Sequence, residues 1–229
     1  MIKIHQIYFN EKSKRNCYPQ WEHYDNSEKL TEYFENTVIV DLIRQGAHKD
    51  AEYFGVFSHD IKREMVYKEW IGENNKLAFS PAALERCIRL YKDVEVFGFQ
   101  RRRENPNIVK QAERYHPGFI KAMEHILSET GFLDAIPPQL NNIILFNHFV
   151  MRSEIYEQYV NELLIPAMEV MRGMPELFKD AKYKRIDEPT KARFLKAFGK
   201  GYFPYHPFIC ERLPSLFMEK YKYSFRQIF

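Results

Sequence analysis

The chain has 229 residues, enough for one domain of generous size, and its 45% hydrophobic and 28% charged residues are typical of a globular protein. Its net charge of +3 does not by itself indicate a nucleic-acid-binding protein, for which a concentrated basic face is expected. Its three cysteines are widely spaced and form no C-x-x-C pair, which argues against a disulfide framework or a zinc site.

The first half of the chain alternates short apolar runs with helical patterns. Alternating side chains predict a first strand at residues 2–9, and a polar, turn-rich loop follows over residues 10–27. Ser27 is a candidate N-cap for a helix that continues to Ile43. The apolar run at residues 51–58 predicts a buried strand that ends abruptly in polar residues.

The middle of the chain continues this alternation. Ser80 before Pro81 is typical of a helix start, and residues 94–99 predict another strand. Residues 105–129 predict two helical pieces divided at a proline, and residues 143–151 form a third strand-like run.

The last third of the chain is mainly helical in pattern. Residues 153–172 give the clearest helix, which Pro166 should kink or divide. Residues 173–203 are charged and partly helical, and residues 208–222 predict a final helix. Strands that alternate with helices predict a single α/β domain over residues 1–229 with a small sheet of three or four strands.

Several common functional motifs are missing from the sequence. It contains no P-loop, no G-x-G-x-x-G after a strand, no H-E-x-x-H and no G-x-S-x-G. No apolar run reaches the roughly 18 residues needed to span a bilayer, and the N-terminus lacks the apolar region of a signal peptide. We therefore expect a cytoplasmic protein with at most peripheral membrane contact.

Four blocks of sequence together carry a resemblance to a known family. They are Ile4-His5-Gln6-Ile7-Tyr8-Phe9, the segment from Glu52 to Asp60 (EYFGVFSHD), the segment from Phe146 to Tyr159 (FNHFVMRSEIYEQY), and the segment from Tyr205 to Leu213 (YHPFICERL). Their order resembles the small bacterial domains assigned to exopolysaccharide and capsule synthesis as glycosyltransferases. The resemblance implies a GT-A-like, Rossmann-type α/β domain with a small mixed sheet and many helices. It also implies a nucleotide-sugar donor and a glycan or lipid-linked acceptor.

The same resemblance suggests which side chains hold the donor. Gln6, Tyr8 and Asn10, at the end of the first strand, would face the base and ribose, and His59 begins the polar segment after the second strand. The diphosphate would be neutralised by side chains of this segment, namely Lys62 and Arg63, or by Mn²⁺ or Mg²⁺ on Asp60 and His206. Only one acid stands where such enzymes usually have Asp-x-Asp. A solvated loop is the alternative explanation for the segment from His59 to Arg63, and simple strand polarity is the alternative for Gln6, Tyr8 and Asn10.

Candidate catalytic residues come from two later segments. Glu211 is a candidate general base, with a structural Glu211–Arg212 ion pair as the alternative. Asn147 and His148 interrupt an apolar run, so they either face a cleft or form satisfied hydrogen bonds within the core.

Three functions follow as hypotheses. The first is a glycosyltransferase, and the second is a catalytically silent module that binds a glycan or a protein. The third, a nucleic-acid-associated protein, rests on Arg101–Arg103 and the aromatic content, and we expect no nucleic-acid partner.

Overall fold

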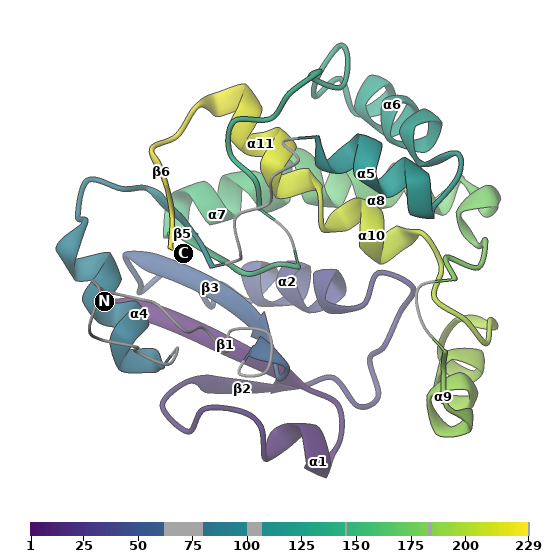
Figure 1. Cartoon of the computed structure of the whole chain (residues 1–229). Helices are drawn as coiled ribbons and strands as arrows, with labels where there is room; N and C mark the ends of the chain where they lie inside the picture. The colour runs from purple at the N-terminus through teal and green to yellow at the C-terminus, as the bar shows by residue number, and fades with distance from the viewer. Residues whose placement is uncertain (62–79, 100–106, 145, 183–184, 229) are drawn as a thin grey trace, which may run out of the picture.

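A computed structural model of the chain describes residues 1–61, 80–99, 107–144, 146–182 and 185–228, and it has a mixed α/β architecture (Figure 1). One sheet contains six strands in the order β2-β1-β3-β5-β4-β6. The strands are β1 (Ile2–Tyr8), β2 (Glu22–Asp25), β3 (Tyr53–Ser58), β4 (Val96–Gly98), β5 (Phe149–Arg152) and β6 (Phe225–Gln227). The sheet therefore has two strands more than the largest number predicted from the sequence.

The strand directions make one half of the sheet parallel. β1 lies between β2 and β3 and is parallel to both, whereas β5 is antiparallel to β3 and to β4. β6 is parallel to β4 and brings the C-terminal segment of the chain back to the sheet. The carboxyl ends of β1, β2 and β3 consequently meet at one edge.

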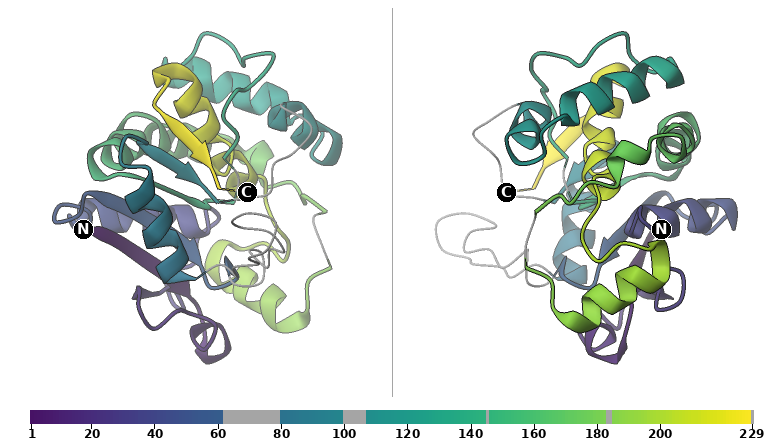
Figure 2. Two further views of the ribbon diagram at one scale, coloured as in Figure 1. Left: turned by 60° about the vertical axis from the view of Figure 1, so that its left-hand side comes forward. Right: turned by 90° about the vertical axis from the view of Figure 1, so that its right-hand side faces the viewer.

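Helices cover both faces of the sheet, unevenly (Figures 1 and 2). The helices are α1 (Glu11–Lys14), α2 (Glu35–Arg44), α4 (Pro81–Leu90), α5 (Ile108–Tyr115), α6 (Phe119–Thr130), α7 (Ser153–Tyr159), α8 (Ile165–Arg172), α9 (Glu188–Phe198), α10 (His206–Cys210) and α11 (Leu213–Tyr221). The larger core lies between the sheet and α2, α5 to α8, α10 and α11. The smaller core lies between the opposite face and α4.

Alternation along the central strand explains the two cores. On β3, Phe54 and Val56 belong to the larger core, while Tyr53 and Phe57 belong to the smaller one. Successive side chains of a strand point to opposite faces, so a strand buried on both sides reads as one continuous apolar run. The strand predicted at residues 51–58 is confirmed for this reason.

The structure also confirms one helix start and one helix division that the sequence predicts. The Ser80 hydroxyl accepts a hydrogen bond from the Ala83 amide at the start of α4. The long helix over residues 153–172 is divided into α7 and α8 by a π-helical turn, Val160–Leu164, directly before Pro166. The proline ring cannot donate to the helix and crowds the carbonyl four residues earlier, so the helix widens there.

Three sequence predictions differ from the structure. The predicted loop at residues 10–27 contains α1 and β2, and the predicted run at 143–151 becomes a strand only from Phe149. β2 is a short edge strand with mostly exposed side chains, so it is held by backbone hydrogen bonds to β1 and has no apolar pattern to reveal it.

The helix predicted to start after Ser27 begins instead at Glu35. The Ser27 amide donates to the Asp25 carboxylate in a turn. Phe34, directly before the helix, has a positive φ of 54°. The residues between Ser27 and Glu35 are not helical, so the local capping signal at Ser27 does not mark the start of α2.

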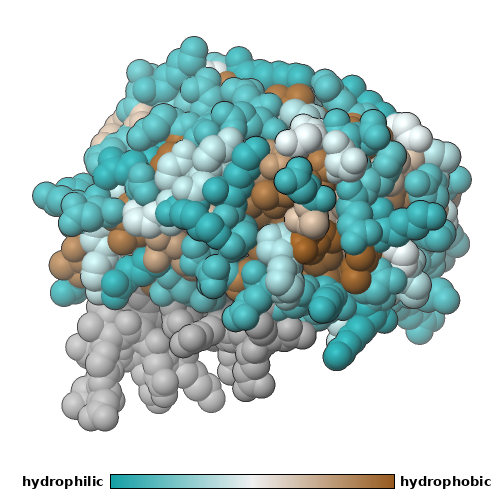
Figure 3. Space-filling model, turned by 90° about the horizontal axis from the view of Figure 1, so that it is seen from above, coloured by the Kyte–Doolittle hydropathy of each residue, from teal (hydrophilic) through white to brown (hydrophobic). Residues whose placement is uncertain are grey.

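The face of the molecule seen from above is largely hydrophilic among the described residues (Figure 3). The face seen from above carries hydrophobic side chains only in limited areas, the largest near its centre and right (Figure 3). In the described part of the chain, no helix combines the length and the apolar character required to cross a membrane.

Candidate functional site

The candidate site is a pocket of about 660 Å³ at the carboxyl edge of the parallel strands, here named the switch-point pocket. Its lining includes Phe9 and Asn10 after β1, Asn26 after β2, and His59 and Asp60 after β3. The chain passes from β1 outward to β2 and then across to β3 on the other side of β1. Open α/β sheets bind ligands outside the carboxyl ends of strands at such a reversal of strand order.

A second hollow of about 540 Å³ lies at the amino end of β1, where Met1 to Ile4 and Trp21 contribute to its lining. Ligands of open α/β sheets bind outside the carboxyl ends of the strands, whereas this hollow lies at an amino end. The switch-point pocket is therefore the better candidate.

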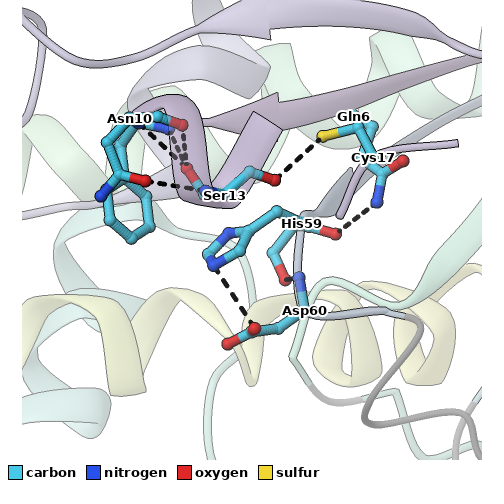
Figure 4. A network of polar contacts seen from close by, with 8 residues as sticks. Gln6, Asn10, Ser13, Cys17, His59 and Asp60 are labelled. Atoms are coloured by element: carbon cyan, nitrogen blue, oxygen red, sulfur yellow. Dashed lines mark hydrogen bonds and ion pairs between the residues drawn. The ribbon is translucent and has the colours of Figure 1, made fainter. Parts of the chain in front are cut away.

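His59 and Asp60 form the polar tip of β3 (Figure 4). The His59 Nε2 atom lies 3.3 Å from an Asp60 carboxylate oxygen, and the two side chains are 15% and 28% exposed. The His59 ring meets the Phe9 ring edge-on at 4.7 Å between centroids. The tip therefore offers a hydrogen-bonding pair that is partly shielded but still accessible to a ligand.

Helix α9 and the start of α2 form the opposite wall of the pocket. Phe194 of α9 packs edge-on against Phe34 and Phe203, with centroids 5.3 and 5.0 Å apart. Arg193, the preceding residue, donates from Nη2 to the Asn26 carbonyl at 3.0 Å. These aromatic contacts and this hydrogen bond hold α9 across the strand ends.

Charged groups of both signs line the pocket. Arg193 and Arg185 contribute positive charge, and Asp60, Glu35 and Asp187 contribute negative charge. Burial lowers the pKa of the Arg193 guanidinium, and the negative charge of Glu35 acts against this shift. A guanidinium stays protonated at neutral pH even so, and Arg193 therefore brings a poorly hydrated positive charge to the pocket.

Of the residues predicted to bind the donor, Asn10 and His59 line this pocket. The Asn10 side chain also has a structural role, since its Oδ1 accepts from the Ser13 amide and caps α1. Gln6 is fully buried, with Nε2 donating to the Ser58 carbonyl at 3.1 Å and Oε1 accepting from the Tyr18 amide at 2.7 Å. Gln6 thus ties β1 to its neighbours and is not among the residues that line the pocket.

Tyr8 does not line the pocket either. Its ring lies beside His23 of β2, at 6.4 Å between centroids, and under the Lys14 ammonium at 5.3 Å. Lys62 and Arg63, as well as Arg101–Arg103, lie outside the described residues.

The reversed strand β5 brings the predicted Asn147–His148 pair to the same edge of the sheet. Phe149 pairs with Gly98 at the carboxyl end of β4, so the residues just before β5 lie at the carboxyl edge of its neighbours. His148 is only 2% exposed and lies near the rings of Phe57 and Phe146. Asn147 donates to the Asn36 side chain at 3.3 Å. Neither residue lines the switch-point pocket, and their burial fits the alternative of core residues.

Glu211 and His206 are placed away from the pocket lining. A Glu211 carboxylate oxygen lies 3.6 Å from Arg212 Nη1, which is the structural ion pair named as the alternative. His206 is 1% exposed and packs against Tyr33 and Phe178. Burial lowers the pKa of His206 to about 4. The structure therefore unites His59 and Asp60 but does not bring Glu211 or His206 to the pocket.

No cluster of three or more His, Cys, Asp or Glu side chains suited to a metal ion occurs within the described ranges. In the pocket, the carboxylates of Asp60, Glu35 and Asp187 and the ring of His59 are among the groups that could contact a cation. The assignment of Asp60 and His206 as a shared metal site stays a prediction, although only Asp60 lines the pocket.

Arg193, Asn26 and Glu35 are pocket residues that the sequence did not reveal. Asp187 followed by Pro189 is a helix-start signal that could have located α9, because its carboxylate accepts from the Thr190 amide. The packing of α9 across the strand ends has no such local signal.

Searches against protein-family models, curated proteins and solved structures found no match to this chain.

Proposed function

We propose that the protein is a glycosyltransferase that moves a sugar from a nucleotide-sugar donor to a glycan or lipid-linked acceptor. The observation that carries the proposal is the switch-point pocket at the carboxyl ends of three parallel strands. A mainly parallel sheet with one reversed strand and helices on both faces is compatible with the GT-A-like fold that the sequence blocks suggest.

The pocket has the chemical groups that such a reaction needs. The carboxylate of Asp60 can accept hydrogen bonds from sugar hydroxyls, and the phenylalanine rings offer apolar faces to a sugar or a base. Asp60, paired with His59, is the candidate to receive the proton of the acceptor hydroxyl. Its reach to that proton depends on the pose of the bound substrates.

The test is isothermal titration with UDP-, GDP- and CMP-sugars, each with and without Mn²⁺, followed by an assay for release of the nucleotide. We expect binding of at least one donor, and Asp60→Asn should reduce release by about 100-fold or more if Asp60 is the base. Asp134→Asn, a change at an exposed carboxylate elsewhere, is the matched control. Failure of every donor to bind would refute the proposal.

The phenylalanine-lined wall of the pocket also suits a glycan-binding module without catalysis. Glycan binding together with no affinity for any nucleotide would favour that second function.

A further inference from the structure

Arg193 is held in an unusual position at the wall of the switch-point pocket. Its guanidinium lies 4.4 Å from the centroid of the Phe9 ring, and Nη2 donates to the Asn26 carbonyl at 3.0 Å. These two contacts come from the segments after β1 and β2, so the side chain is fixed by the sheet edge although it belongs to α9. A guanidinium stacked on an aromatic ring loses less conformational freedom when it binds a ligand.

Two buried polar atoms beside this contact have no partner within the described part of the chain. They are the Arg193 Nε atom, which is a donor, and the Asn26 Oδ1 atom, which is an acceptor. Asn26 is 4% exposed, and both residues line the pocket. An unsatisfied buried polar atom costs about 1–3 kcal/mol, so such atoms in a native fold call for an explanation.

A single ligand would satisfy both atoms if it carried an anionic oxygen next to a hydroxyl group. The guanidinium fork matches a phosphate in shape and charge, whereas Asn26 Oδ1 can only accept a hydrogen bond and so suits a hydroxyl. Because Arg193 also bonds to the Asn26 backbone, the two unsatisfied atoms belong to neighbouring groups. Phosphate esters of sugars and nucleosides have this combination of groups.

We propose that Arg193 binds the diphosphate of the donor, and that Asn26 Oδ1 accepts a hydrogen bond from a hydroxyl of the same ligand. The inference rests on the proposed function, whose donor it describes in more detail. It makes α9 a part of the binding site that supplies positive charge. It also makes the Glu35 carboxylate, whose charge acts on Arg193, a competitor of the bound phosphates.

The experiment is titration of the full chain with UDP, GDP, CMP and inorganic pyrophosphate in the presence of a chelator. We expect Arg193→Gln to weaken binding of the preferred nucleotide by about 10- to 100-fold, because one or two charge-assisted hydrogen bonds are lost. Arg193→Lys keeps the charge without the planar fork and should give an intermediate loss. Glu35→Gln should tighten binding several-fold, since a repulsive charge is removed.

The matched control is Lys196→Gln, which removes the same charge from the same helix at a side chain that is 80% exposed. It should leave nucleotide affinity within about twofold, because an exposed charge is screened by solvent and salt. Circular dichroism melts of each variant establish that it is folded.

A separate variant tests the role of Asn26 by comparing nucleotide binding with pyrophosphate binding. Asn26→Ala should weaken binding of the nucleotide but not of pyrophosphate, which carries no sugar hydroxyl. Equal losses for both ligands would overturn the assignment of Asn26 to a hydroxyl.

The outcomes separate this inference from the function on which it rests. Nucleotide binding that is unchanged in folded Arg193→Gln and Arg193→Lys would overturn the role of Arg193 and leave the glycosyltransferase proposal standing. Pyrophosphate binding that depends on Arg193, with no nucleotide bound, would support an anion site and refute the proposed donor. No binding of any of these ligands would overturn both.

Discussion

Two arginines of this protein are held in similar ways but in different surroundings. Arg193 and Arg212 each lie over a phenylalanine ring, at 4.4 and 5.3 Å from the centroid, and each donates to a backbone carbonyl. Arg212 is 8% exposed, donates to the carbonyls of Phe208 and Ile108, and pairs with Glu211. Arg193 is only half-buried, and its Nε, beside a pocket, has no partner among the residues that the structure describes.

The difference shows what distinguishes a structural charge from one available to a ligand. The hydrogen bonds of Arg212 are used within the fold, between α10, α11 and the start of α5, so its replacement should act on stability. Arg193 has a donor, Nε, that the described part of the fold does not use, so its replacement should act on binding. Substitutions at these two arginines and at other titratable side chains test this contrast.

Arg212→Met should destabilise the protein by about 4 kcal/mol. The change removes a buried ion pair and leaves the carbonyls of Phe208 and Ile108 without these donors. Urea unfolding measures the loss, and Arg89→Met, at an exposed arginine of α4, is the control with a small expected effect. Similar losses for both variants would contradict the structural role of Arg212.

Acidification should cost about 3 kcal/mol of stability through His206. Burial lowers its pKa in the folded state to about 4 from an ordinary value of 6.5, so the unfolded chain takes up the proton first as the pH falls. The loss from this residue therefore develops between about pH 6.5 and pH 4 and is complete below that range. Above about pH 6.5, His206 is neutral in both the folded and the unfolded chain, and it causes no loss of stability.

His206→Phe should flatten that part of the pH profile of unfolding free energy. Neither ring nitrogen of His206 has a hydrogen-bond partner among the residues described, so the change should cost little stability at pH 7. His125→Gln, at an exposed position of α6, should leave the profile as in the unaltered protein. A wild-type slope in folded His206→Phe would show that other groups govern the acid response.

Arg193→Met should change stability by less than about 1 kcal/mol. It loses a partly exposed cation–π contact and one hydrogen bond, but it also removes a buried donor that has no partner within the described ranges. The same urea titration applies. A loss as large as that of Arg212→Met would place Arg193 with the structural arginines and remove the basis of the comparison.

Lys196→Gln should give the smallest effect, an unfolding curve that overlays the wild-type curve. Its ion pair with Glu28 joins two side chains that are each 80% exposed, so the attraction is largely screened. Adding salt should therefore change the stability of the variant and the wild type alike. A clear difference between their salt dependences would contradict this.

The sequence predicted the parts of the fold that depend on local patterns. β3 can be predicted because its run of apolar side chains is buried on both faces. The start of α4 can be predicted because Ser80 and Pro81 are typical helix-start residues. β2 and β6 could not be predicted, because each is a short edge strand without an apolar run and is held by pairing with β1 and β4, respectively. The start of α2 at Glu35 was missed as well, because a capping signal at Ser27 is local and does not show where the helix begins in the fold.

The residues of the candidate site also differ in how well the sequence predicted their surroundings. His59 and Asp60 could be singled out because the polar residues after a buried strand lie at the edge where open α/β sheets bind ligands. Glu211 and His206 were also singled out by residue type. Glu211, however, pairs with the adjacent Arg212, and His206 is buried against Tyr33 and Phe178.

The α/β class, the central strands and the polar tip of β3 follow from side-chain periodicity and local capping, so they can be inferred from the amino-acid sequence. The antiparallel direction of β5, and the position of α9 across the strand ends with Arg193 over Phe9, depend on how distant segments pack together. Those contacts join residues up to 184 positions apart along the chain, from Phe9 to Arg193, and no local pattern encodes such a meeting.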